Sequence, residues 1–261
     1  MKKKSILMAA IAVMLVAVLV VGGTLAYFTD KTDVVDNVFT TGNVKIAVQE
    51  DFEQNSKLVP GTQTMNTVKK VVDVKNTGSE DAFVRVHIAI PAALVDQDIN
   101  AYNDMLHMNF TGASAADGKW SWHPKMCEGN GWTANGRANN NTYNTTIDGV
   151  DYTVWVITYR TALKHDEVTE HAIHQVYLDK FVEATVGEDG AVTYTKPFFT
   201  DRQGGTVDPE KTMTYTVPAD GIQIKVIAEG VQAEGFSDAY EALNTAFGTP
   251  GATGYVSPFN K

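Results

Sequence analysis

Short runs that alternate apolar and polar residues with a period of two constrain the fold of this chain more than any other feature. The clearest run extends from Ala82 to Ile90. Successive side chains of a strand point to opposite faces of its sheet, so this pattern predicts a strand whose two faces carry different kinds of residue. One face would carry Val84, Val86, Ile88 and Ile90, and the other Phe83, Arg85, His87 and Ala89.

Runs of similar character recur along the chain and are separated by turn-forming residues. Further strands are predicted at 43–49, 68–76, 152–159, 172–178, 181–185, 191–195, 212–217 and 222–232. The strands at 68–76 and 82–90 flank Asn-Thr-Gly-Ser-Glu, which indicates an antiparallel hairpin. Many short strands with turns between them favour an all-β fold, an antiparallel β-sandwich.

Two segments depart from the strand pattern. Residues 91–150 are dense in Gly, Asn and aromatic residues, and we interpret them as an irregular insertion that includes a short helix from Gln97 to His107. Near the carboxy end, Ser237 is a suitable N-cap for a short helix that Gly248 ends. We therefore expect one sandwich domain at 43–261, with its insertion at about 91–150.

The amino end has the features of a secretory signal peptide. Three lysines are followed by an apolar run from Ile6 to Val21, and Ala26 is a small residue at a suitable cleavage position before Tyr27. The alternative is an uncleaved anchor, but a spanning helix needs about 20 apolar residues, and this run is shorter and ends at Gly22-Gly23. We expect residues 1–26 to be removed, so that membrane contact is transient.

Composition narrows the classes of partner. The removed segment contains three lysines and no acidic residue, so cleavage would change the formal net charge from −10 to −13 and leave 235 residues. An acidic surface of this kind argues against binding to nucleic acid or to anionic membranes. Cys127 is the single cysteine, which excludes an internal disulfide and leaves a buried residue or a free thiol.

The sequence offers no recognisable catalytic constellation. The zinc-protease motif H-E-x-x-H is absent, as are a phosphate-binding loop and a dinucleotide fingerprint. His171 and His174 would share a face only on a helix, whereas the residues after them indicate a strand. From these patterns we assign no catalytic, metal or cofactor residue.

Several segments resemble the TasA/camelysin family of secreted Gram-positive proteins. The amino end carries the pattern G-G-T-x-A-[AY]-F-x-D at 22–30, followed by F-x-[ST]-G-x-[VL]-x-[IL] at 39–46. Residues 58–61, 72–79 and 82–86 are similar to the L-x-P-G, V-x-N-x-G-[ST] and V-R-V segments of that family. Residues 228–236 resemble its A-E-A-V-Q-A-[DE]-G-F tail, with Gly230 in place of the usual Ala.

The resemblance implies a jelly-roll-like β-sandwich that is exported through a SipW-type signal peptidase. It implies a location in the extracellular matrix or on the cell surface of a Gram-positive-type bacterium, and polymerisation into biofilm fibres. Camelysin-like members are described as metalloproteases, which is one alternative. A monomeric surface adhesin that binds through the 91–150 insertion is another.

Assembly would need an open sheet edge and a free strand. Residues 27–42 follow the cleavage site, and a strand from this segment can complete the sheet of a neighbouring copy by β-augmentation. Such a contact is head-to-tail and would yield a homopolymer, although other matrix proteins are alternative partners. The candidate donor-strand residues are Tyr27, Phe28, Val34, Val35, Val38 and Phe39.

Overall fold

The computed structural model describes residues 29–31, 44–53, 56–62, 64–96, 103–109, 120–121, 142–201 and 205–261. Only the backbone is described at 29–31, 109 and 120–121. Within these ranges, no helix is both long and apolar enough to cross a membrane.

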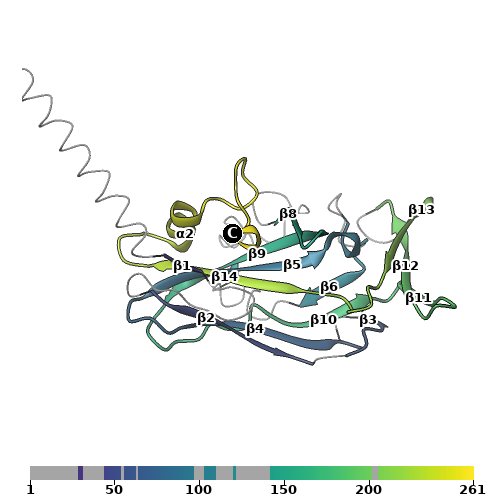
Figure 1. Cartoon of the computed structure of the whole chain (residues 1–261), viewed down its shortest axis with the longest axis horizontal. Coiled ribbons are helices and arrows are strands. Elements are labelled where there is room, and N and C mark those ends of the chain that lie inside the picture. Colours follow the sequence, from purple (N-terminus) through teal and green to yellow (C-terminus); the bar gives the residue numbers. More distant parts are fainter. Residues whose placement is uncertain are drawn as a thin grey trace, which may run out of the picture.

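Two sheets form the body of the molecule (Figure 1). The first has the order β1-β14-β5-β9, with β7 and β8 both paired to β9, and all of its pairs are antiparallel. Its strands are β1 (Thr29–Lys31), β14 (Lys225–Gln232), β5 (Ala82–Pro91), β9 (Val150–Leu163), β7 (Trp120–Ser121) and β8 (Thr142–Ile147).

The second sheet has the order β2-β4-β10-β3, and β6 also pairs with β10. The contact between β3 and β10 is parallel, and the other pairs are antiparallel. Its strands are β2 (Ile46–Phe52), β4 (Val68–Asn76), β10 (Ile173–Asp179), β3 (Pro60–Gly61) and β6 (Leu106–Asn109).

A third, smaller sheet lies at one end of the body, on the right in Figure 1. It consists of β11 (Glu183–Val186), β12 (Val192–Phe199) and β13 (Val207–Thr216), in that order and antiparallel. The helical elements are η1 (Ala92–Leu94), α2 (Ala239–Phe247) and η3 (Pro258–Asn260).

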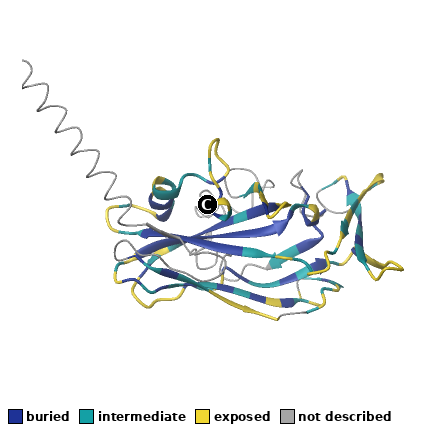
Figure 2. Cartoon of the chain, in the orientation of Figure 1, coloured by how far each residue is buried: buried dark blue, intermediate teal, exposed yellow. Residues whose placement is uncertain are grey.

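The main core lies between the first two sheets, as expected for a sandwich. Ile46, Val72 and Val74 from the second sheet pack with residues of the first sheet, Val84, Val86, Ile88 and Ile157. Figure 2 shows that buried positions concentrate in the central strands of the body. The prediction of an all-β antiparallel sandwich with a short carboxy-terminal helix is confirmed.

Strand β5 is buried at all ten positions, and the two faces predicted from its alternation are both found. Val84, Val86 and Ile88 point into the core. Phe83, on the opposite face, packs against α2. The chain after β14 therefore covers the outer face of the first sheet, and this cover accounts for buried polar residues on β5.

The predicted hairpin between 68–76 and 82–90 is wrong. Strand β4 pairs with β2 and β10, whereas β5 pairs with β14 and β9, so the connection crosses between the sheets. Asn76 is fully buried and shapes this crossing, because its Nδ2 donates to the carbonyls of Glu80 and Leu163 and its Oδ1 accepts from Gly78 N. Turn residues predict a reversal but not which sheet the chain enters next.

Two helix predictions also need correction. The described part of the helix predicted from Gln97 to His107 is not helical, and Leu106–Asn109 is strand β6, paired with β10. The helix predicted near the carboxy end exists as α2, but its N-cap is Asp238, whose side chain accepts from Glu241 N. Ser237 lies one residue earlier and donates its hydroxyl to the Glu241 carboxylate.

The 91–150 segment contributes strands to both large sheets. Among its described residues, β6 pairs with β10 of the second sheet, and β7 and β8 pair with β9 of the first. Trp120 is part of β7. Cys127 and Trp132 lie outside the described residues.

Candidate functional site

The edge of the first sheet is the part of the fold that the predicted strand donation concerns. Strand β14 pairs with β5 along its whole length, from Lys225 opposite Ala89 to Gln232 opposite Ala82. On its other side, β1 pairs with Glu229, Gly230 and Val231. A strand from the amino-terminal segment therefore covers three of the eight positions of β14.

The two faces of β14 have different surroundings. Val226 and Ala228 face the main core, and Gly230 lies on the same face. Val231 faces the other way and packs with residues of α2. Glu229 also faces this outer layer, where its carboxylate contacts the side chains of Arg85 and His87 on β5.

Close packing across the sandwich accounts for the glycine on β14. A Cβ atom at Gly230 would lie 3.0 Å from both Cδ1 and Cγ2 of Ile46 on β2. Such a distance is shorter than ordinary van der Waals contact, so alanine would push Ile46 or β14 out of place. The departure from the alanine of the TasA/camelysin pattern therefore fits the close approach of β2 and β14.

A buried group of charged side chains fixes the outer face of β14. Arg85 and His87 on β5 both contact Oε2 of Glu229, with Arg85 Nε at 2.7 Å and His87 Nε2 at 3.1 Å. All three side chains are at most 1% exposed. Arg85 also donates to Asn244 Oδ1 on α2 and to the carbonyl of Gly248, at 3.0 and 3.1 Å.

The charges around Glu229 keep its carboxylate ionised. Burial alone would raise its pKa, but the hydrogen bond and charge of His87, together with Arg85, outweigh that cost. The pKa of Glu229 is consequently lowered to about 2. A carboxylate with this pKa accepts hydrogen bonds throughout the physiological range and does not act as a general acid there.

A chain of hydrogen bonds continues from this group to the carboxy-terminal segment. His87 Nδ1 lies 3.2 Å from Tyr143 Oη on β8, which lies 3.1 Å from Ser257 Oγ. Burial raises the pKa of the Tyr143 hydroxyl, and Tyr255 packs edge-on against the same ring. This series of Ser, Tyr, His and Glu side chains resembles a proton relay. Its contacts connect β5, β8, β14 and the last residues of the chain, so we interpret it as structural.

Other described histidines lie apart from this cluster and contact nearby carboxylates or backbone. His171 Nδ1 lies 2.6 Å from Asp73 Oδ1, and His165 Nδ1 lies 2.6 Å from the carbonyl of Gly78. His174 lies on strand β10, so the strand predicted after His171 is confirmed. In the part of the chain that the structure describes, no three His, Cys, Asp or Glu side chains are grouped so as to hold a metal ion.

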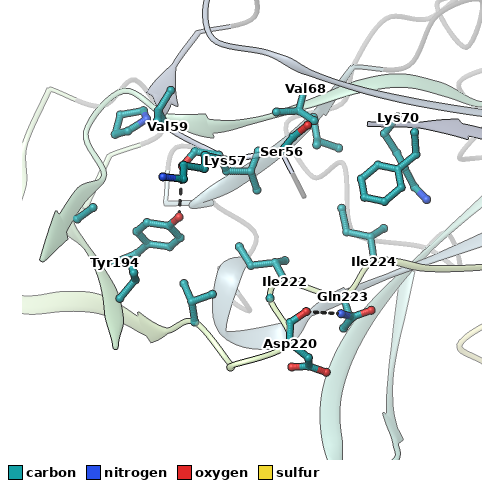
Figure 3. A pocket seen from close by; sticks show the side chains of 18 of the residues that line it. Ser56, Lys57, Val59, Val68, Lys70, Tyr194, Asp220, Ile222, Gln223 and Ile224 are labelled. Carbon is teal, nitrogen blue, oxygen red and sulfur yellow. Dashed lines mark hydrogen bonds between the residues drawn. The ribbon is translucent and has the colours of Figure 1, made fainter. Parts of the chain in front are cut away.

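An apolar pocket lies where the third sheet meets the body (Figure 3). Its volume is about 840 Å³, and its wall includes Val68 of β4, Tyr194 of β12 and Ile222 and Ile224 before β14. Tyr194 Oη donates to the carbonyl of Leu58 at 3.3 Å, which ties the third sheet to the loop before β3. The wall is mainly hydrophobic and gathers no set of catalytic groups.

The residues predicted for cleavage and strand donation lie outside the described residues. These are Ala26, Tyr27, Phe28, Val34, Val35, Val38 and Phe39. Thr29–Lys31, which lie between them in the sequence, form β1 on the edge of β14. Sequence reasoning missed the Glu229 cluster, because nothing in the spacing of residues 85, 87 and 229 indicates that they meet.

The sheet topology and the pairing of β1 with β14 define the class of this protein. It is an all-β sandwich in which the amino-terminal segment supplies a strand to the edge of the first sheet. Residues 1–110 match the family model described as camelysin metallo-endopeptidase. Over these residues the chain is similar to that family, so the resemblance predicted from the sequence is confirmed there. Comparisons with curated proteins and with solved structures gave no match.

The name of the matched family implies a catalytic metal. The described residues do not fit such a site, because they offer neither a cluster of three metal-binding side chains nor the H-E-x-x-H pattern, which the whole sequence lacks. We therefore derive no catalytic step through a metal from this structure.

Proposed function

We propose that this chain is a secreted structural protein of the cell surface or biofilm matrix that polymerises into fibres by donor-strand β-augmentation. A SipW-type signal peptidase would cut between Ala26 and Tyr27 and so release the amino-terminal segment. The pairing of β1 with three of the eight positions of β14 carries the proposal, because a strand of the amino-terminal segment already pairs along this edge. The relationship of residues 1–110 to the camelysin family supports the cell-surface location.

The register of β1 suggests how a donor strand would fit. Thr29 pairs with Val231 and Lys31 with Glu229 in an antiparallel ladder. If a neighbouring molecule supplied its segment in this register, Val34 would lie opposite Val226 and Val35 opposite Lys225. Backbone hydrogen bonds would then extend along β14, and the contact would repeat head-to-tail into a filament.

Electron microscopy of the chain without residues 1–26 tests the proposal. We expect filaments from residues 27–261 and none from residues 40–261, because the shorter chain lacks the donor strand. Circular dichroism and thermal unfolding of both forms would verify that the shorter chain is folded. Filaments from folded 40–261 would overturn the proposal.

A peptide of residues 27–39 provides an independent test of the acceptor edge. Excess peptide should slow filament growth of residues 27–261, since it would occupy β14 without bringing a further sandwich domain whose own β14 could accept the next strand. A peptide with the same composition in scrambled order is the matched control. Equal inhibition by both peptides would contradict a register-specific site.

Protease activity is the second candidate function, and the name of the matched family favours it. Casein digestion by the purified chain, with and without a chelator, tests it directly. Digestion that the chelator abolishes and metal restores would establish a metalloprotease. Its absence in filament-forming protein would leave the structural function as the better account.

A further inference from the structure

A buried lysine joins the third sheet to the body of the sandwich. The side chain of Lys196 on β12 is 0% exposed, although it carries an ammonium group. Its Nζ donates to the carbonyl of Asp104 at 2.7 Å and lies 3.1 Å from Oδ1 of Asp179, the last residue of β10. Lys196 and Asp179 therefore come from different sheets and meet in a protected position.

Burial favours the reactive form of this amine. Desolvation lowers the pKa of Lys196, against the opposing attraction of the Asp179 and Asp104 carboxylates. Burial raises the pKa of the Asp179 carboxyl, but His107, the Phe181 N–H and Lys196 lower it overall. The neutral amine and neutral acid are therefore a minor state in equilibrium with the ion pair, reached when the ammonium loses a proton and Oδ2 of Asp179 gains one. The hydrogen bond to the Asp104 carbonyl holds the nitrogen beside Asp179 during this exchange.

The Asp179 carboxyl has donors at both oxygens. The backbone N–H of Phe181 donates to Oδ1 at 2.9 Å, and Nε2 of His107 lies 3.1 Å from Oδ2. The His107 ring stacks on Tyr177 with their centroids 5.0 Å apart, which fixes its orientation. One oxygen thus faces a donor able to stabilise an oxyanion, and the other faces a group that can transfer a proton.

We propose that Lys196 and Asp179 condense into an intramolecular amide bond. The neutral Nζ attacks Cγ of Asp179, whose carboxyl carries its proton on Oδ2, and the negative charge that develops on Oδ1 is held by Phe181 N–H. His107 protonates Oδ2 as its bond to Cγ breaks, Oδ2 leaves as water, and His107 regains its proton from the nitrogen. The net change is one ammonium and one carboxylate converted to one amide and one water.

The position of this bond gives it a mechanical role. It would join β12 to β10 and close the segment that contains β11, so that the third sheet could not separate from the body without breaking a covalent bond. A protein exposed outside the cell or carrying tension within a surface layer would gain resistance to unfolding and proteolysis. This inference does not require fibre formation, because the two residues lie within one chain.

Mass spectrometry of the purified chain, with its amino terminus identified, tests the proposal. We expect an intact mass below the sequence mass by one water molecule, and a branched peptide that contains both Lys196 and Asp179 after digestion. Lys196→Arg keeps the positive charge and should restore the full sequence mass. A wild-type chain with the full sequence mass would overturn the proposal.

Asp179→Asn provides a second, chemically distinct test. Attack on the amide carbon of asparagine releases ammonia instead of water, so this variant and the wild type should converge on the same final mass. Loss of water at an Asp-Gly succinimide is the competing reaction, and such sequences occur at 117–118, 148–149, 189–190 and 220–221. Water loss that persists in Lys196→Arg would assign it to one of these sites and contradict the proposed bond.

Discussion

Nε of Arg85 on β5 lies 2.7 Å from Oε2 of Glu229 on β14, and the two residues are also direct partners in the register of the strands. The pair lies beneath the carboxy-terminal layer, where Arg85 also bonds to Asn244 and Gly248. One guanidinium thus connects β5, the edge strand β14 and the helix α2 that covers them. Its planar set of donors suits this task better than the single ammonium of a lysine.

Removal of Arg85 should strongly destabilise the fold. Arg85→Ala leaves the buried Glu229 carboxylate without its guanidinium partner, and breaking a buried pair in this way costs about 3–5 kcal/mol. The free energy of unfolding measured in urea would show the loss. The matched control is Lys69→Ala, which removes an ion pair with Asp51 whose side chains are 50% and 67% exposed. We expect the control to cost at most about 1 kcal/mol, and similar losses in the two variants would contradict the importance of the buried pair.

Acid should weaken the fold through Glu229. Its pKa is about 2 in the folded protein against an ordinary value of 4.5, so the unfolded chain takes up the proton first as the pH falls. Stability from this group is fully present above pH 4.5 and is lost as the pH falls toward 2. Urea unfolding across this pH window should show the free energy of unfolding of the wild type falling toward that of Glu229→Gln. The comparison isolates Glu229 from Asp179 and Asp166, whose pKa values are also lowered. A constant difference between the two proteins would contradict this assignment.

The alternation of residues 82–90 was sufficient to predict β5 and both of its faces. Alternation reflects the local geometry of a strand. In a central strand of a sandwich, a shift of one residue would turn every core side chain to the wrong face, so the pattern specifies which residues face the core. It also placed Arg85 and His87 opposite the core face. The sequence did not show that this second face is buried too, because its cover comes from residues beyond 236.

Pairings between distant segments were the part that local patterns could not predict. Turn residues after Asn76 suggested a hairpin, but Asn76 instead bonds to Leu163 and directs the chain into the other sheet. The ion pair between Lys196 and Asp179 joins two sheets and has no sequence signature. Such contacts depend on how whole strands are arranged, which the spacing of residues along the chain does not encode.

Gly230→Ala should destabilise the sandwich through a single atom. The new Cβ would lie 3.0 Å from two side-chain carbons of Ile46, and overpacking of this kind typically costs about 1–3 kcal/mol. Ile46→Val removes Cδ1 and should partly relieve the contact, so the two substitutions together should cost less than the sum of their separate effects. A double-mutant cycle measured by urea unfolding checks this coupling. Strict additivity would show that Ile46 does not limit the size of residue 230.

The N-cap of α2 offers a prediction that separates Asp238 from its neighbour Ser237. Asp238 Oδ1 accepts from the backbone N–H of Glu241 at 2.9 Å, so Asp238→Ala leaves a helix donor without its side-chain partner and should cost about 1 kcal/mol. Ser237 bonds only through its hydroxyl and backbone to the exposed Glu241 carboxylate, and Ser237→Ala should cost less. Thermal unfolding of both variants under the same conditions measures the difference. Because α2 also packs on Phe83 and holds Arg85 through Asn244, loosening its first turn should raise hydrogen exchange along this layer. A larger loss of stability for Ser237→Ala than for Asp238→Ala would show that Ser237, which the sequence pattern indicates, is the N-cap.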